Sequence, residues 1–151
     1  GGRLRTRLPK LGKTYTISLW FWNGMPVDSR PVLGWMFSRG HDNSLDAPGD
    51  HLGLDGKGLL LFNDGSKNYQ GKTTVKRWTW RQAALARKGE DLRVYLDGKL
   101  EIEAKAKANS LAEDVFVGGR NDNQSNWEGR LDEVAVFDRA LTPPEIKKLS
   151  H

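Results

Sequence analysis

Glu101 and Glu103 are the two carboxylates whose spacing comes closest to a catalytic pair. Retaining glycan hydrolases place two carboxyl groups about 5–5.5 Å apart so that they flank the bond to be broken. Residues two apart share one face of a strand, but Lys99 and Lys105 share that face with the glutamates, which is typical of a solvated surface. The sequence contains no Glu-x-Asp-x-Glu run, and we therefore expect no catalysis at these positions.

Other signatures of enzymatic chemistry are missing from the sequence. His41, His51 and His151 are too far apart for a local zinc motif, no His-Glu-x-x-His run occurs, and cysteine is absent. Gly118-Gly119-Arg120 precedes polar residues without helical periodicity, so it lacks the helix that a phosphate-binding loop needs. We expect a protein that is not an enzyme. An unrecognised lyase or hydrolase is the least favoured alternative.

Two polar loops that carry an aromatic residue point to ligand binding instead. Sugar rings have apolar faces and a rim of hydroxyl groups, so sugar sites combine exposed Trp or Tyr rings with polar and charged hydrogen-bonding groups. Trp127 and Tyr69 each follow such a loop. The alternative for Trp127 is that its ring folds back over the end of the core. The candidate carbohydrate-binding residues are Asn63, Asp64, Lys67, Tyr69, Arg120, Asn123 and Trp127.

The charge of the chain gives a hint about the ligand. The formal net charge is +5, and Arg3, Arg5 and Arg7 would share one face of a strand. Arginine pairs with sulfate and carboxylate groups in bidentate fashion, so an anionic polysaccharide is slightly favoured over a neutral one. No nucleic-acid-binding motif accompanies the basic residues, and we expect no nucleic acid partner.

Length and composition determine what can position these residues. The chain has 151 residues, which predicts one domain over residues 1–151. No run approaches 18 apolar residues, so we expect no insertion into a membrane. Six Trp and 17 Gly favour an all-β domain with many turns.

The period-two pattern of apolar residues predicts the strands. In residues 14–22, Ile17, Leu19 and Phe21 share one face, and Trp20 and Trp22 share the other, as expected of a central strand. We expect further strands at 3–8, 32–38, 52–54, 58–63, 70–75, 80–87, 91–96, 99–104, 115–117 and 131–137.

Two local motifs complete the predicted architecture. Asp97-Gly98 is a strong hairpin turn, after which Leu100, Ile102, Ala104 and Ala106 would face the core and the alternating Lys and Glu residues the solvent. A helix over 103–108 is the alternative there. Thr142-Pro143-Pro144-Glu145 is a capping box that predicts a short helix over 143–149. The expected fold is an antiparallel two-sheet sandwich with one C-terminal helix.

Several segments of the chain resemble one protein family. They are Tyr15–Trp20, Trp80–Arg87, Leu92–Lys99 and Gly129–Thr142 with Glu145-Ile146 behind it. In order and spacing they are similar to the laminin-G-like branch of the concanavalin A-like jelly rolls. The resemblance implies two antiparallel sheets, one of them curved, with loops at one rim and a concave face open to ligands. It also implies core positions for Trp20 and Trp80, and leaves Trp22, Trp35 and Trp78 unassigned.

The resemblance carries expectations about cofactor and context. Related jelly-roll enzymes hold a structural calcium with an Asp at the position of Asp132, and the alternative is that Asp132 anchors backbone amides. Members usually begin with a further strand that nothing before Gly1 supplies, so we expect a piece of a larger multidomain protein that lacks the first strand. The superfamily includes lectins, carbohydrate-binding modules, hydrolases and adhesion domains, so the fold alone does not choose a function.

The preferred interpretation is a non-catalytic, lectin-like carbohydrate-binding module of a secreted bacterial protein, at an extracellular, cell-surface or periplasmic location. Its partner would be a polysaccharide or an oligosaccharide, and the charge of the chain slightly favours an anionic one. The alternative is a protein–protein adhesion or architectural domain, which would use a flat apolar surface.

Overall fold

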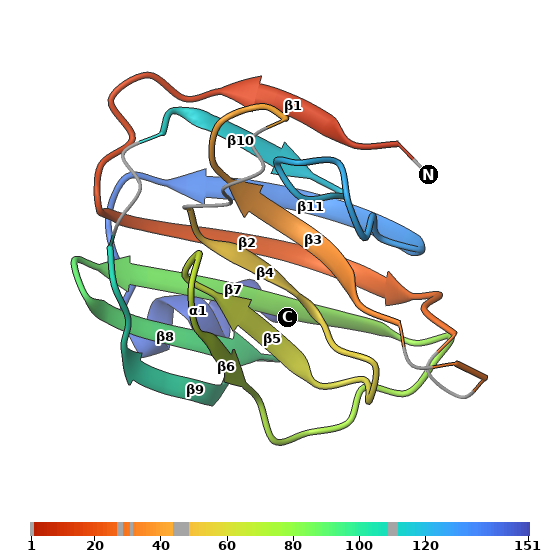
Figure 1. The fold of residues 1–151 in the computed structure, drawn as a ribbon. Helices are drawn as coiled ribbons and strands as arrows, with labels where there is room; N and C mark the ends of the chain where they lie inside the picture. The colour runs from red at the N-terminus through yellow and green to blue at the C-terminus, as the bar shows by residue number, and fades with distance from the viewer. Residues whose placement is uncertain (1, 27–28, 31, 44–48, 109–111) are drawn as a thin grey trace.

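The chain folds into two antiparallel sheets that lie face to face (Figure 1). The computed structural model describes residues 2–26, 29–30, 32–43, 49–108 and 112–151. One sheet has six strands, in the order β1 (Leu4–Arg7), β10 (Asp114–Val117), β3 (Gly34–Arg39), β4 (His51–Leu54), β5 (Leu60–Asn63) and β6 (Asn68–Gln70). The other has five, in the order β11 (Gly129–Phe137), β2 (Thr14–Asn23), β7 (Trp80–Lys88), β8 (Asp91–Leu96) and β9 (Lys99–Lys105). The predicted jelly-roll sandwich is confirmed.

The core lies between the sheets and is built by alternate residues of each strand. Ile17, Leu19 and Phe21 of β2 are buried there, as the alternation predicts. The six-stranded sheet contributes Phe37 of β3 and Phe62 of β5, among others. Fully burying side chains of this size stabilises a fold by about 1.5–3 kcal/mol each, so this layer holds the sheets together.

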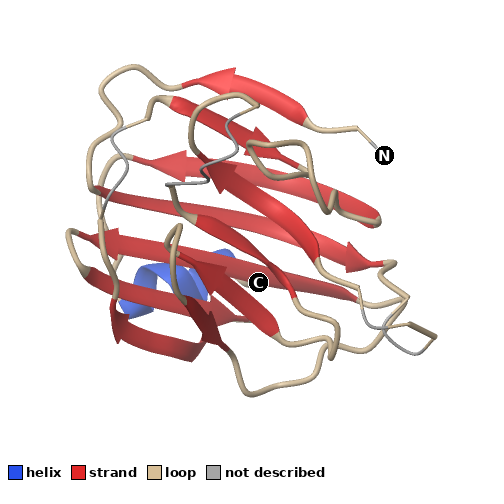
Figure 2. Cartoon of the chain, in the orientation of Figure 1, coloured by secondary structure: helices blue, strands red, loops and turns tan. Residues whose placement is uncertain are grey.

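The only helix in the described part of the chain, α1 (Pro143–Leu149), lies on the outer face of the five-stranded sheet, away from the core (Figure 2). Its capping box is formed as predicted, with Thr142 accepting from the Glu145 amide. Ile146 packs onto Ala84 and Ala86 of β7, where small side chains leave room for it. The helix covers only part of this outer face. Within the described residues, no helix is long and apolar enough to cross a membrane.

Strand β9 departs from the predicted alternation. A bulge between β8 and β9 pairs Val94 with Ile102 but Tyr95 with Leu100, so one extra residue, Glu101, lies on β9. The bulge turns Leu100 outward, where it is 47% exposed, and buries Glu101. The prediction that Leu100 faces the core is therefore wrong, and so is the helix considered for 103–108, because β9 runs to Lys105.

A second difference from the prediction lies beside the inward-facing carboxylate of Glu101. Its two oxygens accept hydrogen bonds from the amide and the hydroxyl of Thr73, at 2.8 and 3.2 Å. Thr73 is thereby bonded to β9 of the other sheet. The strand predicted at 70–75 is found earlier, as β6, Asn68–Gln70.

A buried ionic cluster joins the two sheets at one end of the sandwich. Arg87 of β7 donates to Asp50 at 2.9 Å, and both side chains are buried. The Tyr15 hydroxyl donates to the same carboxylate at 2.6 Å. Arg87 also donates to the carbonyl of Ala106, so one guanidinium ties three chain segments together. Removing only one partner of such a buried pair destabilises a protein, because the remaining charge is left unpaired in the interior.

Candidate functional site

Trp127 of the predicted sugar site belongs to the core. Its side chain is 6% exposed and packs edge-on against Phe21, with ring centroids 5.8 Å apart. Gly34 makes room for it, because a Cβ there would lie 3.1 Å from the Trp127 ring and 2.5 Å from the Met25 sulfur. The expectation of an exposed ring at Trp127 is wrong, and the alternative, a ring folded over the end of the core, is what the structure has.

The predicted residues at the β5–β6 turn are used mainly by the turn itself. The Asp64 carboxylate is buried and accepts from the amides of Ser66 and Lys67 at 2.9 and 2.7 Å. Burial would raise the pKa of Asp64, but these hydrogen bonds outweigh it and hold the pKa below its ordinary value. Asn63 donates to Asn68 at 2.7 Å. Their role in binding sugar stays a prediction.

The two predicted loops lie at different ends of the sandwich. Tyr69 packs on Phe62, and Phe62 lies under the guanidinium group of Arg87. Arg87 of β7 is paired with Tyr15 of β2. Trp127 packs on Phe21, six residues further along β2. At about 3.3 Å per residue the two places are about 20 Å apart. The expectation that the fold brings Trp127 and Tyr69 together is therefore wrong.

The basic residues in which the sequence suggested an anion site are mostly paired within the chain. Arg120 pairs with Asp122, and Asn123 lies exposed in the same loop. Arg3 and Arg5 both pair with Asp42, at 2.7 and 2.9 Å. The third arginine of that strand, Arg7, pairs with Glu113 at 2.9 Å. These guanidinium groups would have to leave a carboxylate before they could bind a ligand.

Asp132 is the residue for which the resemblance implies a structural calcium. Its exposed carboxylate accepts a hydrogen bond from the amide of Glu133 at 2.8 Å, the amide-anchoring contact of the alternative interpretation. In the described ranges no three Asp, Glu, His or Cys side chains gather where they could hold a metal ion. Calcium prefers six to eight oxygen ligands, so binding at Asp132 would need backbone oxygens or water beside this carboxylate, and it stays a prediction.

A group of exposed and half-buried tryptophans on the outer face of the five-stranded sheet was not predicted as a site. We call it the tryptophan face, and it consists of Trp20, Trp22, Trp78 and Trp80. Trp78 is 55% exposed and Trp80 is 44% exposed, so the core position expected for Trp80 is wrong. Trp20 and Trp22 are half-buried on this outer face, so the core position expected for Trp20 is wrong as well. Trp22 lies opposite Trp80 in the register of β2 and β7, and its ring centroid is 5.0 Å from that of Trp78.

The end of β2 holds the tryptophan face in place. Asn23 is buried and exchanges backbone hydrogen bonds with the segment before β7: its amide donates to Thr79 at 3.0 Å and its carbonyl accepts from Trp78 at 2.7 Å. Its side-chain amide donates to the carbonyl of Val75 at 3.1 Å. The loop that carries Trp78 is therefore fastened to the strand that carries Trp22.

Trp78 has a strained backbone. Its φ is +70°, in the left-handed region that bulky side chains seldom adopt. Such a conformation costs about 1–3 kcal/mol and is concentrated at functional sites. In this conformation the Trp78 ring lies against the Trp22 ring, with the ring planes inclined by 42°.

The sequence did contain a signal for this surface. The alternation in β2 puts Trp20 and Trp22 on the face opposite Ile17, Leu19 and Phe21, and that division is confirmed. Among the elements that the structure describes, only the short helix α1 covers the outer face, and it lies over Ala84 and Ala86. Large rings beyond the reach of such a helix must stay exposed.

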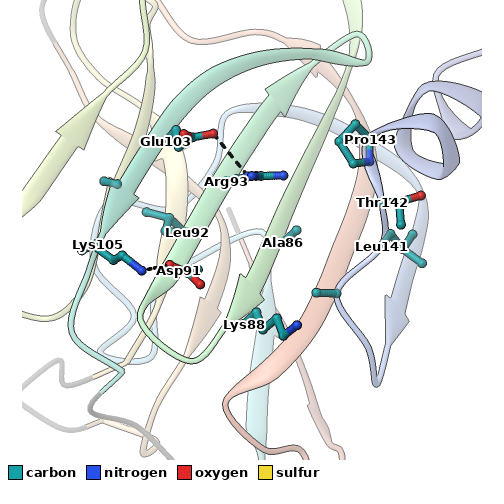
Figure 3. A pocket seen from close by; sticks show the side chains of 12 residues that line it. Ala86, Lys88, Asp91, Leu92, Arg93, Glu103, Lys105, Leu141, Thr142 and Pro143 are labelled. Carbon is teal, nitrogen blue, oxygen red and sulfur yellow. Dashed lines mark hydrogen bonds and ion pairs between the residues drawn. The ribbon is translucent and has the colours of Figure 1, made fainter.

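A hollow of about 610 Å³ lies on another part of the same outer face, beside the start of α1 (Figure 3). Four of its charged groups form two pairs, Arg93 with Glu103 at 3.3 Å and Lys105 with Asp91. Pro143 forms part of its wall. Aromatic rings are absent from the residues that line it, so it offers no surface for stacking.

Solved structures of the same fold include sugar-binding proteins. A heptameric SAP-like pentraxin from Limulus polyphemus has a TM-score of 0.75 at 18% identity, over 99% of this chain and 75% of the other. The CBM40 of a Ruminococcus gnavus IT-sialidase, bound to α2,3-sialyllactose, has a TM-score of 0.74 at 16% identity, over 94% of this chain and 85% of the other. Domain 4 of the Geobacillus stearothermophilus arabinanase AbnA, bound to arabinotriose, has a TM-score of 0.65 at 19% identity, over 92% of this chain and 67% of the other.

These likenesses show that the chain shares its fold with these proteins. A comparison with curated proteins gave no match. A laminin-G model, described as concanavalin A-like lectin/glucanases superfamily, matches residues 3–147, which is nearly the whole chain. The chain therefore belongs to the concanavalin A-like lectin/glucanase superfamily.

Proposed function

We propose that the chain is a non-catalytic carbohydrate-binding domain of a secreted bacterial protein, and that it binds an anionic polysaccharide on the tryptophan face. The observation that carries the proposal is the ring pair of Trp22 and Trp78, 5.0 Å apart, next to the exposed Trp80. Flat aromatic groups suit the apolar faces of sugar rings.

Charged groups beside these rings support the choice of ligand. Arg77 and Arg130 lie against the tryptophan rings, at 4.0 Å from Trp78 and 5.2 Å from Trp22. A guanidinium group is suited to carboxylate or sulfate groups on a sugar chain. Among the fold neighbours, one is bound to sialyllactose, which carries a carboxylate, and one to arabinotriose, which is neutral, so they favour a sugar ligand and leave its charge to the arginines.

Binding of a protein partner is the second candidate. Trp and Arg are enriched among the residues that dominate protein–protein affinity, and the tryptophan face contains both. The two candidates predict different ligands for one surface, so the same variants test both.

The test is affinity electrophoresis of the purified chain through gels that contain soluble acidic or neutral polysaccharides. We expect an acidic polysaccharide to retard the wild-type chain. The Trp78→Ala variant should bind that polysaccharide about tenfold more weakly, which corresponds to about 1.4 kcal/mol. Leu100→Ala is the matched control, because Leu100 is an exposed apolar residue on the same sheet outside the tryptophan face. Migration unaffected by every polysaccharide would refute the sugar proposal and favour the protein partner.

A further inference from the structure

Two arginines rest on the tryptophan face. The guanidinium carbon of Arg77 is 4.0 Å from the ring centroid of Trp78, and that of Arg130 is 5.2 Å from the ring centroid of Trp22. Both distances are within the range of cation–π attraction. A sugar that stacks on either ring must compete with a guanidinium group that is already there.

Arg130 differs in its partners from the arginines of the predicted anion site. Arg3, Arg5 and Arg120 pair with carboxylates at 2.5–2.9 Å. Arg130, in contrast, pairs with no carboxylate among the described residues, and its guanidinium group lies over the Trp22 ring. It is exposed on β11, directly opposite Trp22 in the register with β2.

We propose that Arg77 and Arg130 determine specificity by an exchange of partners, in which each guanidinium leaves a tryptophan ring for an acid group of the bound sugar chain. The inference rests on the proposed function, since it needs a sugar on the tryptophan face. A neutral sugar displaces the guanidinium groups and offers them no charge in return. An acidic sugar supplies a carboxylate or sulfate within their reach, so the lost cation–π contact is replaced by a charge-assisted hydrogen bond.

Asp132 gives the ligand a direction. It lies opposite Trp20, two residues from Arg130 on the same face of β11, and its carboxylate is exposed. An acidic chain is repelled there. The favourable path runs from Arg130 across Trp22 to Trp78 and Arg77, away from Asp132.

The experiment uses pairs of polysaccharides that differ in charge and share a backbone: polygalacturonate with its methyl ester, hyaluronan with its methyl ester, and carboxymethyl cellulose with hydroxyethyl cellulose. Affinity is measured for the wild-type chain and for the Arg77→Gln, Arg130→Gln double variant, which keeps polar side chains and removes both charges. Arg93→Gln is the control, because Arg93 is exposed on the same sheet but pairs with Glu103 at 3.3 Å.

We expect the wild type to prefer the acidic member of at least one pair. The double variant should bind that member at least fivefold more weakly and its neutral counterpart equally well or better, and Arg93→Gln should change neither. Equal weakening for both members, or wild-type preference for the neutral members, would overturn the exchange while the proposed function stands. If the wild type binds none of the six polysaccharides, the proposed function fails, and the exchange fails with it.

Discussion

Replacing Trp127 by alanine tests whether this residue belongs to the core or to a binding site. The side chain is 6% exposed and lies between Phe21, Met25 and Gly34. Removal of the indole leaves a cavity that these neighbours cannot fill by small shifts, because Phe21 is itself fixed in β2 between β7 and β11. We therefore expect a large loss of stability and little specific effect on ligand binding.

The size of the loss follows from the burial. Truncation of a buried Trp or Phe to Ala costs about 3–5 kcal/mol. For a domain of this size, 1 kcal/mol lowers the melting temperature by about 2–4 °C, so Trp127→Ala should melt about 6–20 °C below the wild type. Trp127→Phe is the matched variant, and its effect should be less than half as large. It keeps an aromatic ring and removes an indole N–H that is buried without a hydrogen-bond partner among the described residues.

Thermal unfolding followed by circular dichroism, with urea titration as a second measurement, gives the stability of all three proteins. Retardation in polysaccharide gels is measured below the melting transition, where the variants are folded. The burial argument is refuted if Trp127→Ala melts within about 2 °C of the wild type and yet loses its polysaccharide binding. That outcome would restore Trp127 as an exposed binding residue.

Three further predictions concern the charged groups. Asp50→Asn should lower the free energy of unfolding by about 3–5 kcal/mol in urea titrations, because it leaves the buried Arg87 without its 2.9 Å partner; a change below about 1 kcal/mol would contradict this. Arg139 lowers the pKa of Glu145 to about 2, below the ordinary value of about 4.3, so this pair stabilises the fold above about pH 4 and loses its effect as the pH falls through 2. Melting curves of wild type and Glu145→Gln should therefore differ at pH 7 and converge near pH 2. EDTA and millimolar calcium should give melting temperatures within about 1 °C of each other; a higher value in calcium, lost in Asp132→Ala, would restore the calcium site.

The sequence predicted the inner side of the fold better than its outer side. Alternation in β2 identified Ile17, Leu19 and Phe21 as core because burial between two sheets enforces one repeat along a whole strand. The capping box likewise identified α1, since it depends on residues only three apart. Both signals are local or strictly periodic, and neither requires knowledge of a distant neighbour.

The errors came from contacts between segments that are distant in sequence. Trp127 follows a polar loop, which favours exposure, but the pocket that buries it is made by Phe21 and Gly34, about a hundred residues earlier. One bulge exposes Leu100 and buries Glu101. The Thr73 amide that donates to the buried Glu101 carboxylate lies 28 residues earlier, in the segment after β6. Side-chain burial at such points depends on tertiary contacts that no repeat in the sequence records.

The tryptophan face is difficult to explain as a device for stability. Where β8 and β9 meet solvent they carry charged residues such as Arg93 and Glu103, and Ala84 and Ala86 are covered by α1. A face selected only for folding would be polar beyond the edge of the helix, because exposed apolar patches favour unwanted association. Trp80 there is 44% exposed.

The backbone leads to the same conclusion independently. Trp78 holds a φ of +70°, which glycine or asparagine would adopt at lower cost, and its ring is 55% exposed. A strained backbone and an exposed ring are both unfavourable for the free protein, and they coincide at one residue. Features that oppose stability at a single place are expected where a ligand compensates for them. Trp78→Gly should accordingly leave the free domain at least as stable as the wild type. It should also abolish retardation by the polysaccharide that the wild type binds. A Trp78→Gly domain that is destabilised but binds normally would show that the ring serves the fold instead.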